Sequence, residues 1–99
     1  MKASFQDLIS SETPTVIDFF ATWCGPCRMV TPILEDLKSD MGESVRVYKI
    51  DVDQNPHLAA QYNVRSVPTL MIFKDGKLKW RQAGVQSKAT LKSVIESIR

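Results

Sequence analysis

The stretch Ala21-Thr22-Trp23-Cys24-Gly25-Pro26-Cys27-Arg28 contains both cysteines of this 99-residue chain, separated by two residues. Residues 15–20 before it have the composition of a β-strand, and residues 27–39 after it have the apolar spacing of a helix. A Cys-x-x-Cys pair between a strand and a helix favours a dithiol/disulfide redox centre. The first cysteine would lie at the helix N-terminus, where unpaired N–H groups and the helix dipole stabilise a thiolate.

Disulfide exchange assigns different tasks to the two sulfurs. The attacking sulfur must be an exposed thiolate, and the second thiol must be close enough to displace the mixed disulfide. We therefore predict Cys24 as the nucleophile and Cys27 as the resolving thiol. Pro26 between them carries neither a charge nor an N–H donor that would stabilise the thiolate further. This favours a reductant over an oxidase or isomerase of an oxidising compartment.

A metal site is the main alternative for the cysteine pair, because Cys-x-x-Cys is also half of a zinc or iron–sulfur site. A closed site needs two more ligands. The chain has no further cysteine and a single histidine, His57, in a different predicted element. We therefore favour redox chemistry and expect no metal. A binding module, which presents a docking surface or shares a metal across a dimer, is the alternative from another class.

Composition and charge restrict the class of protein. The chain is 43% apolar, which is ordinary for a single small domain over residues 1–99. Its net charge of +2 is too balanced to indicate a nucleic-acid or membrane-surface partner. No apolar run has the length of a membrane span, and no signal-peptide core is visible at the N-terminus. Two cysteines, both in the motif, fit a reducing compartment, so we expect a cytoplasmic protein.

Periodicity along the rest of the chain predicts alternating helices and strands. In helix 27–39, Met29, Val30, Ile33, Leu34 and Leu37 form the apolar side. Strand 15–20 is apolar on both faces except at Asp18, as in a strand covered on both sides. The order predicts an α/β fold with a mixed sheet covered by helices. The remaining predicted elements are helices 4–10 and 56–62, strands 45–52, 69–73 and 78–81, and a last helix capped by Ser87.

Asp18 and Lys49 are polar residues at positions where apolar ones are expected. The apolar neighbours of Asp18 favour burial, which raises a carboxyl pKa and lets the group act as a general base near neutrality. Lys49 alternates onto the face of Val45 and Val47. The pattern alone leaves two interpretations of Lys49 open: an edge lysine that protects the sheet, or a partner for Asp18.

Trp23-Cys24-Gly25-Pro26-Cys27 resembles the active-site motif of thioredoxins. The resemblance runs in family order from about residue 4 to the C-terminus. It implies a thioredoxin fold, except that too few residues precede Phe5 to form the N-terminal strand that thioredoxins usually have. We therefore expect four strands, with residues 45–52 at an edge. The other matching segments are 16–21, Pro32, 49–53, 67–69, 74–76 and Gly84.

The resemblance also implies an activity and its partners. It implies a monomeric protein-disulfide reductase that acts on disulfide-containing proteins and binds no cofactor. A thioredoxin reductase would supply its electrons from NADPH. By the same resemblance, Asp18 would exchange a proton with Cys27, and Lys49 would be the partner of Asp18.

The residues that would receive the substrate also follow from the resemblance. Trp23 would be exposed, and the Val67–Pro68 peptide bond would be cis. The backbone of Val67 would then pair with an extended substrate beside the cysteines. The substrate-binding set implied in this way is Trp23, Gly25, Pro26, Val67, Pro68 and Gly84.

Overall fold

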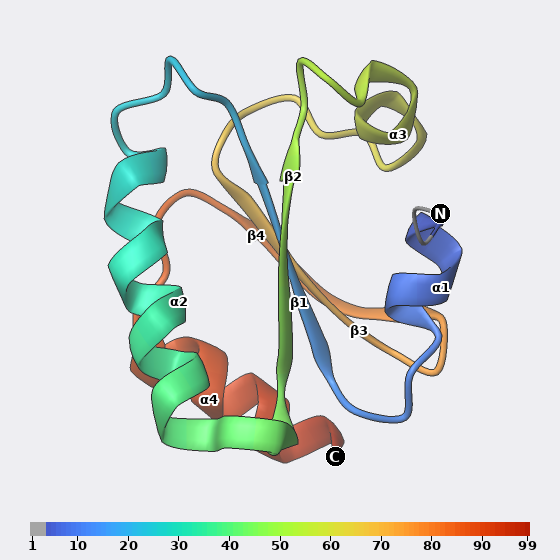
Figure 1. The fold of residues 1–99 in the computed structure, drawn as a ribbon, viewed down its shortest axis with the longest axis vertical. Helices are drawn as coiled ribbons and strands as arrows, with labels where there is room; N and C mark the ends of the chain where they lie inside the picture. The colour runs from blue at the N-terminus through green and yellow to red at the C-terminus, as the bar shows by residue number, and fades with distance from the viewer. Residues whose placement is uncertain (1–3) are drawn as a thin grey trace.

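The computed structural model describes residues 4–99, which form a four-stranded sheet with helices on both faces (Figure 1). The strand order is β2-β1-β3-β4, with β1 parallel to β2 and β3 antiparallel to both β1 and β4. This confirms the predicted α/β class and the mixed sheet. The elements are α1 (Phe5–Ile9), β1 (Thr15–Phe20), α2 (Cys27–Met41), η1, a short 3₁₀ helix (Gly42–Ser44), β2 (Arg46–Asp51), α3 (Pro56–Gln61), β3 (Thr69–Lys74), β4 (Lys77–Ala83) and α4 (Lys88–Ile98).

Two apolar cores lie on opposite faces of the sheet. Helices α2 and α4 cover one face, and the shorter helices α1 and α3 cover the other (Figure 1). Strands β1 and β3 are buried between the two layers, as the apolar pattern of residues 15–20 predicted. The first core includes Val16, Leu34, Leu37, Leu70, Ile72, Leu91 and Ile95. The second includes Ile9, Ile17, Phe19, Met71 and Phe73.

Strand β2 lies at the edge of the sheet, next to β1. This confirms the edge position expected for residues 45–52, although the strand is one residue shorter at each end. The expectation that no strand precedes Phe5 concerns residues 1–3, which lie outside the described part of the chain. Within residues 4–99, no helix is long and apolar enough to cross a membrane.

Strand β4 is longer than the predicted residues 78–81. It extends over Lys77–Ala83 because its pairing with β3 continues until Ala83 lies opposite Thr69. Nearly all of its side chains are exposed. The sequence therefore carries little apolar alternation by which these strand ends could be recognised.

Helix α2 continues to Met41, two residues beyond the predicted end, and Pro32 lies within it. Its buried positions are Cys27, Val30, Leu34 and Leu37, spaced three or four residues apart. Met29 is 61% exposed, so its predicted place on the apolar side of the helix is wrong. One position along a helix turns a side chain by about 100°, which carries Met29 out of this buried row and into solvent.

Candidate active site

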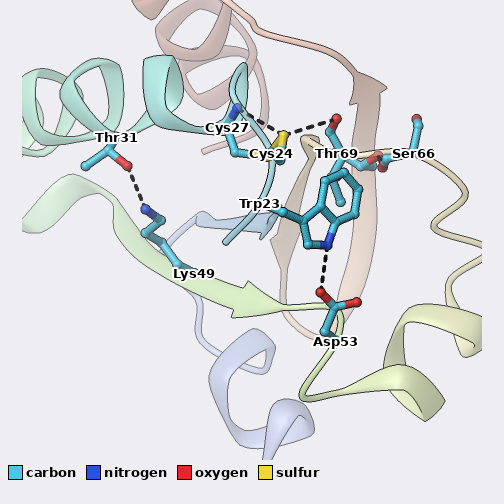
Figure 2. Close-up of a disulfide and its surroundings, with 9 residues drawn as sticks. Trp23, Cys24, Cys27, Thr31, Lys49, Asp53, Ser66 and Thr69 are labelled. Carbon is cyan, nitrogen blue, oxygen red and sulfur yellow. Dashed lines mark hydrogen bonds between the residues drawn. A yellow bond between two sulfur atoms is a disulfide. The ribbon is translucent and has the colours of Figure 1, made fainter. Parts of the chain in front are cut away.

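The two cysteines lie where the loop after β1 enters α2, and they form a disulfide (Figure 2). Helix α2 begins at Cys27, with Pro26 as its N-cap residue and no side chain capping it. The backbone N–H of Cys27 instead donates a hydrogen bond to Cys24 Sγ, with an N–S distance of 3.2 Å. Cys24 therefore lies at the N-terminus of the helix, as predicted, and receives one of its unpaired donors.

Both cysteines are only 4% exposed in this disulfide form. Cys24 is thus less open than the requirement for an exposed attacking sulfur led us to expect. The cause is a small apolar cluster around the disulfide, in which Ala21 is also buried and Phe20, Val52 and Val67 pack against it.

The segment before β3 approaches the disulfide from the opposite side. The Val67–Pro68 peptide bond is cis, as expected, and the Val67 carbonyl oxygen lies 3.6 Å from Cys24 Sγ. The Pro68 carbonyl accepts a hydrogen bond from the Gly84 N–H at 2.8 Å. Gly84 has φ of +90°, a conformation that a side chain would strain. Val67, Pro68 and Gly84 therefore form one continuous backbone surface beside Cys24.

Trp23 is 70% exposed, as expected, although it directly precedes a buried cysteine. Its indole Nε1 donates a hydrogen bond to Asp53 Oδ2 at 2.9 Å (Figure 2). No role was assigned to Asp53 from the sequence, where it appeared only as part of the matching segment 49–53. Next to the indole is a pocket of about 140 Å³, lined by Trp23, Val52, Val64, Arg65, Ser66 and Val67.

Asp18 is fully buried, as predicted from its apolar neighbours. Among residues 4–99, neither of its carboxylate oxygens has a hydrogen-bond partner. Burial raises the pKa of Asp18 from 3.8 to about 6, and the charge of Lys49 acts in the opposite direction. Such a group changes its protonation state close to neutral pH.

Lys49 lies beside Asp18 in the register of β1 and β2, yet its ammonium group binds elsewhere. Lys49 Nζ donates to Thr31 Oγ1 of α2 at 2.6 Å, as Figure 2 shows, and lies 4.8 Å from the centre of the Phe20 ring. The expected partnership with Asp18 is therefore an electrostatic interaction without a direct hydrogen bond. The part played by Thr31 was not visible in the sequence.

Metal-binding geometry was the main alternative for the cysteine pair. Across the part of the chain that the structure describes, no group of three or more histidine, cysteine, aspartate or glutamate side chains could hold a metal ion. His57, the only histidine, is exposed on α3.

Comparison with known proteins identifies the family. The Thioredoxin family model matches residues 1–97. The chain is 46% identical over 95 residues to a thioredoxin of Synechocystis sp. This alignment covers 95% of the chain and 89% of that protein. It is 43% identical over 91 residues to thioredoxin 1 of Synechococcus elongatus, covering 92% of the chain and 85% of that protein.

Solved structures agree with this assignment. A point mutant of thioredoxin from Halobacterium salinarum superposes with a TM-score of 0.85 at 43% identity, covering 94% of this chain and 80% of that one. Oxidised mitochondrial thioredoxin 3 from Saccharomyces cerevisiae gives a TM-score of 0.83 at 39% identity, covering 94% of this chain and 86% of that one. The chain belongs to the thioredoxin family and is a thiol–disulfide oxidoreductase that reduces protein disulfides by dithiol exchange through Cys24 and Cys27.

Proposed function

We propose that Cys24 is the attacking nucleophile of this protein-disulfide reductase and that Cys27 is the resolving thiol. The observation that carries this assignment is the hydrogen bond from the Cys27 N–H to Cys24 Sγ at the start of α2. A donor directed at a sulfur stabilises its thiolate, and the helix N-terminus adds to this effect. Cys27 is itself part of the helix and lies in its buried row.

The exchange then takes two steps. The Cys24 thiolate attacks one sulfur of a substrate disulfide, forms a mixed disulfide and releases the other substrate sulfur as a thiolate. Cys27 loses its proton and attacks Cys24 Sγ, which breaks the mixed disulfide and releases the second substrate thiolate. The substrate gains two electrons, and the protein is left with the Cys24–Cys27 disulfide.

We assign to Asp18 the acceptance of the Cys27 proton in the second step. Its pKa of about 6 supports this, because at neutral pH the Asp18 carboxyl is ionised in most molecules and can still accept a proton readily. Lys49 would modulate this pKa through its charge. Asp18 also lies on β1, the strand that leads directly into the cysteine loop.

The substrate would bind across the surface beside Cys24. The exposed indole of Trp23 offers apolar contact area, and the backbone of Val67 can pair with an extended chain as an added strand does. Gly25 and Gly84 leave space for close approach, because no heavy atom beyond their immediate chain neighbours lies within 4 Å of where a Cβ would be. Pro26 and Pro68 complete the proposed substrate-binding set.

The wider setting is also a proposal. We propose that residues 1–99 act as one domain and as a monomer in the cytoplasm, with no bound cofactor and without nucleic-acid or membrane partners. Thioredoxin reductase would restore the dithiol with electrons from NADPH. Membership of the thioredoxin family supports this cycle.

Trapping experiments test the assignment of the two sulfurs. Cys27→Ser should accumulate a mixed disulfide with insulin through Cys24, because attack proceeds but resolution does not. Cys24→Ser should trap no insulin, and the double variant Cys24→Ser/Cys27→Ser controls for non-covalent association. Mass spectrometry measures the adduct. Faster alkylation of Cys27 than of Cys24 in the reduced wild-type protein at neutral pH would reverse the assignment.

A further inference from the structure

The ammonium group of Lys49 has a defined position although the residue is exposed. Lys49 lies opposite Asp18 in the register of two neighbouring parallel strands, so both side chains stand on the sheet face covered by α2. From α2, Thr31 Oγ1 meets Lys49 Nζ at 2.6 Å (Figure 2). The ring of Phe20, at the end of β1, has its centre 4.8 Å from the same nitrogen.

A pocket of about 200 Å³ opens at this point. Thr31 and Lys49 form part of its lining, together with Phe20, Arg28 and Cys27. The hydrogen bond between Thr31 and Lys49 therefore lies at the wall of an opening that reaches the resolving cysteine. Lys49 thus places a positive charge at the wall of a pocket that Cys27 also lines.

The Lys49 side chain stays in this position only if another group binds its ammonium. Its ammonium group is strongly hydrated, and its four-carbon stem has many rotamers, so an unrestrained Lys49 would extend into solvent. The contact with Phe20 keeps the nitrogen over the face of the ring but provides no hydrogen-bond acceptor for the ammonium N–H groups. The Thr31 hydroxyl is the single hydrogen-bond acceptor that Lys49 Nζ has among the described residues.

We propose that Thr31 is a positioning residue whose hydroxyl holds the Lys49 ammonium near Asp18, at the opening that leads to Cys27. Its consequence for catalysis rests on the proton-transfer role proposed above for Asp18. By keeping the positive charge close, Thr31 favours the Asp18 carboxylate and so keeps it ready to accept the Cys27 proton.

Among the charged groups near Asp18, Lys49 is the one whose position depends on Thr31. Strand β3 places apolar Leu70 opposite Asp18, and α4 contributes apolar Leu91 and Ile95 to this face. On α2, Lys38 is held by the carbonyl groups of Gly42 and Val45. Asp36 and Asp40 of α2 pair with Lys88 and Lys92 of α4. The remaining titratable side chains of α2 are those of Cys27, a thiol in the reduced protein, and of the exposed residues Arg28 and Glu35.

The experiment is a titration of the Asp18 side-chain carboxyl by carbon-13 NMR in the oxidised protein. Thr31→Val removes the hydroxyl but keeps the shape of the side chain, and Thr31→Ala removes it by a second route. Thr31→Ser keeps the hydroxyl and is the matched control. Lys49→Met removes the charge, and the double variant Thr31→Val/Lys49→Met tests whether Thr31 acts through Lys49.

We expect Thr31→Val and Thr31→Ala to raise the pKa of Asp18 by roughly 0.2–0.7 pH units, the size expected for a weakened interaction with an exposed charge. Thr31→Ser should titrate like the wild type. Lys49→Met should raise the pKa at least as far, and adding Thr31→Val to it should change nothing further. An unchanged or lowered pKa in Thr31→Val, or a shift that persists without Lys49, would overturn the inference.

The pH profile of the resolution step separates this inference from the proposed role of Asp18. The rate of Cys27 attack on a Cys24 mixed disulfide should follow the same shift in Thr31→Val. If the NMR titration moves as expected but the rate profile does not, the positioning by Thr31 stands and proton transfer by Asp18 is wrong.

Discussion

At Asp18, the stability of the fold conflicts with the proton transfer that we propose for this residue. Its carboxylate is fully buried and has no hydrogen-bond partner among residues 4–99, so its ionised form is poorly solvated. In the folded protein the pKa of Asp18 is therefore about 6, whereas in the unfolded chain it is near 3.8. Between these two values the folded state binds more protons, so its stability falls as the pH rises. The full cost is present above about pH 6.

Asp18→Asn tests this cost, because it keeps the size of the side chain and removes the titration. A shift from 3.8 to about 6 corresponds to a destabilisation of up to about 3 kcal/mol at pH 7. We expect the variant to be more stable than the wild type at neutral pH, by less than this amount because a buried amide also lacks partners. Below about pH 4, near the unfolded-state value, the advantage should disappear. Urea melts at several pH values measure it.

The same variant should slow the chemistry that proton transfer serves. Resolution by Cys27 should become slower, since the mixed disulfide has lost its proton acceptor, while the first attack by Cys24 changes less. Stopped-flow reduction of a model disulfide separates the two steps. Equal stability at neutral pH together with unchanged turnover would mean that Asp18 is only a tolerated polar residue.

At the scale of elements, the place of Lys49 on β2 fits both interpretations that the sequence left open, an edge lysine and a partner for Asp18. The N–H groups of Arg46 and Val52 bond to Pro14 and Phe20 on the β1 side. Because backbone groups alternate along a strand, those of Val47 and Lys49 point to the open edge. Lys49 thus stands at the exposed backbone of the edge strand, and its side chain also reaches the active-site opening.

Lys49→Val should therefore increase self-association as well as change the active site. A charged side chain at an open edge opposes pairing with another chain, and a β-branched apolar residue favours it. Sedimentation velocity over a concentration series should show more dimer than the wild type. Gln61→Val adds the same side chain at an exposed position of α3 and is the control. Identical sedimentation of both variants would show that Lys49 does not protect the edge.

At the scale of the whole molecule, the active site lies at one end of α2 and much of the core that supports it lies along the rest of that helix. Leu37 is fully buried in the core between α2, α4 and the sheet. It lies ten residues beyond Cys27, which is about 15 Å along a helix axis. A substitution at Leu37 should therefore change the stability of the protein without changing the thiol chemistry at Cys24.

Leu37→Ala should lower the free energy of unfolding by about 2–5 kcal/mol, because it removes buried methyl groups and leaves a cavity. Urea denaturation measures this loss, and Ser39→Ala on the exposed side of α2 is the control. The rate at which Cys24 attacks a model disulfide should stay within about twofold of the wild-type rate, since the helix N-terminus is unaltered. A large fall in that rate under native conditions would show that the core and the site are coupled.

Much of the site could be predicted because its features are local in the sequence. The position of Cys24 at a helix N-terminus follows from the order of strand, motif and helix, and the burial of Asp18 follows from its immediate neighbours. The cis bond before Pro68 and the exposure of Trp23 came from the family resemblance, which the comparisons confirmed.

The remaining features depend on which surfaces the fold brings together. The bond from Lys49 to Thr31 joins β2 to α2, and the bond from Trp23 to Asp53 spans thirty residues. Neither pairing can be predicted from local periodicity. The apolar pattern around a residue indicates whether its side chain is buried, but not which residue it will contact. The sequence by itself determined the elements, the buried face of each and the thiol chemistry of the motif. Only tertiary packing decided that Cys24 is covered in the disulfide form, that Met29 is exposed, and where the charge of Lys49 is held.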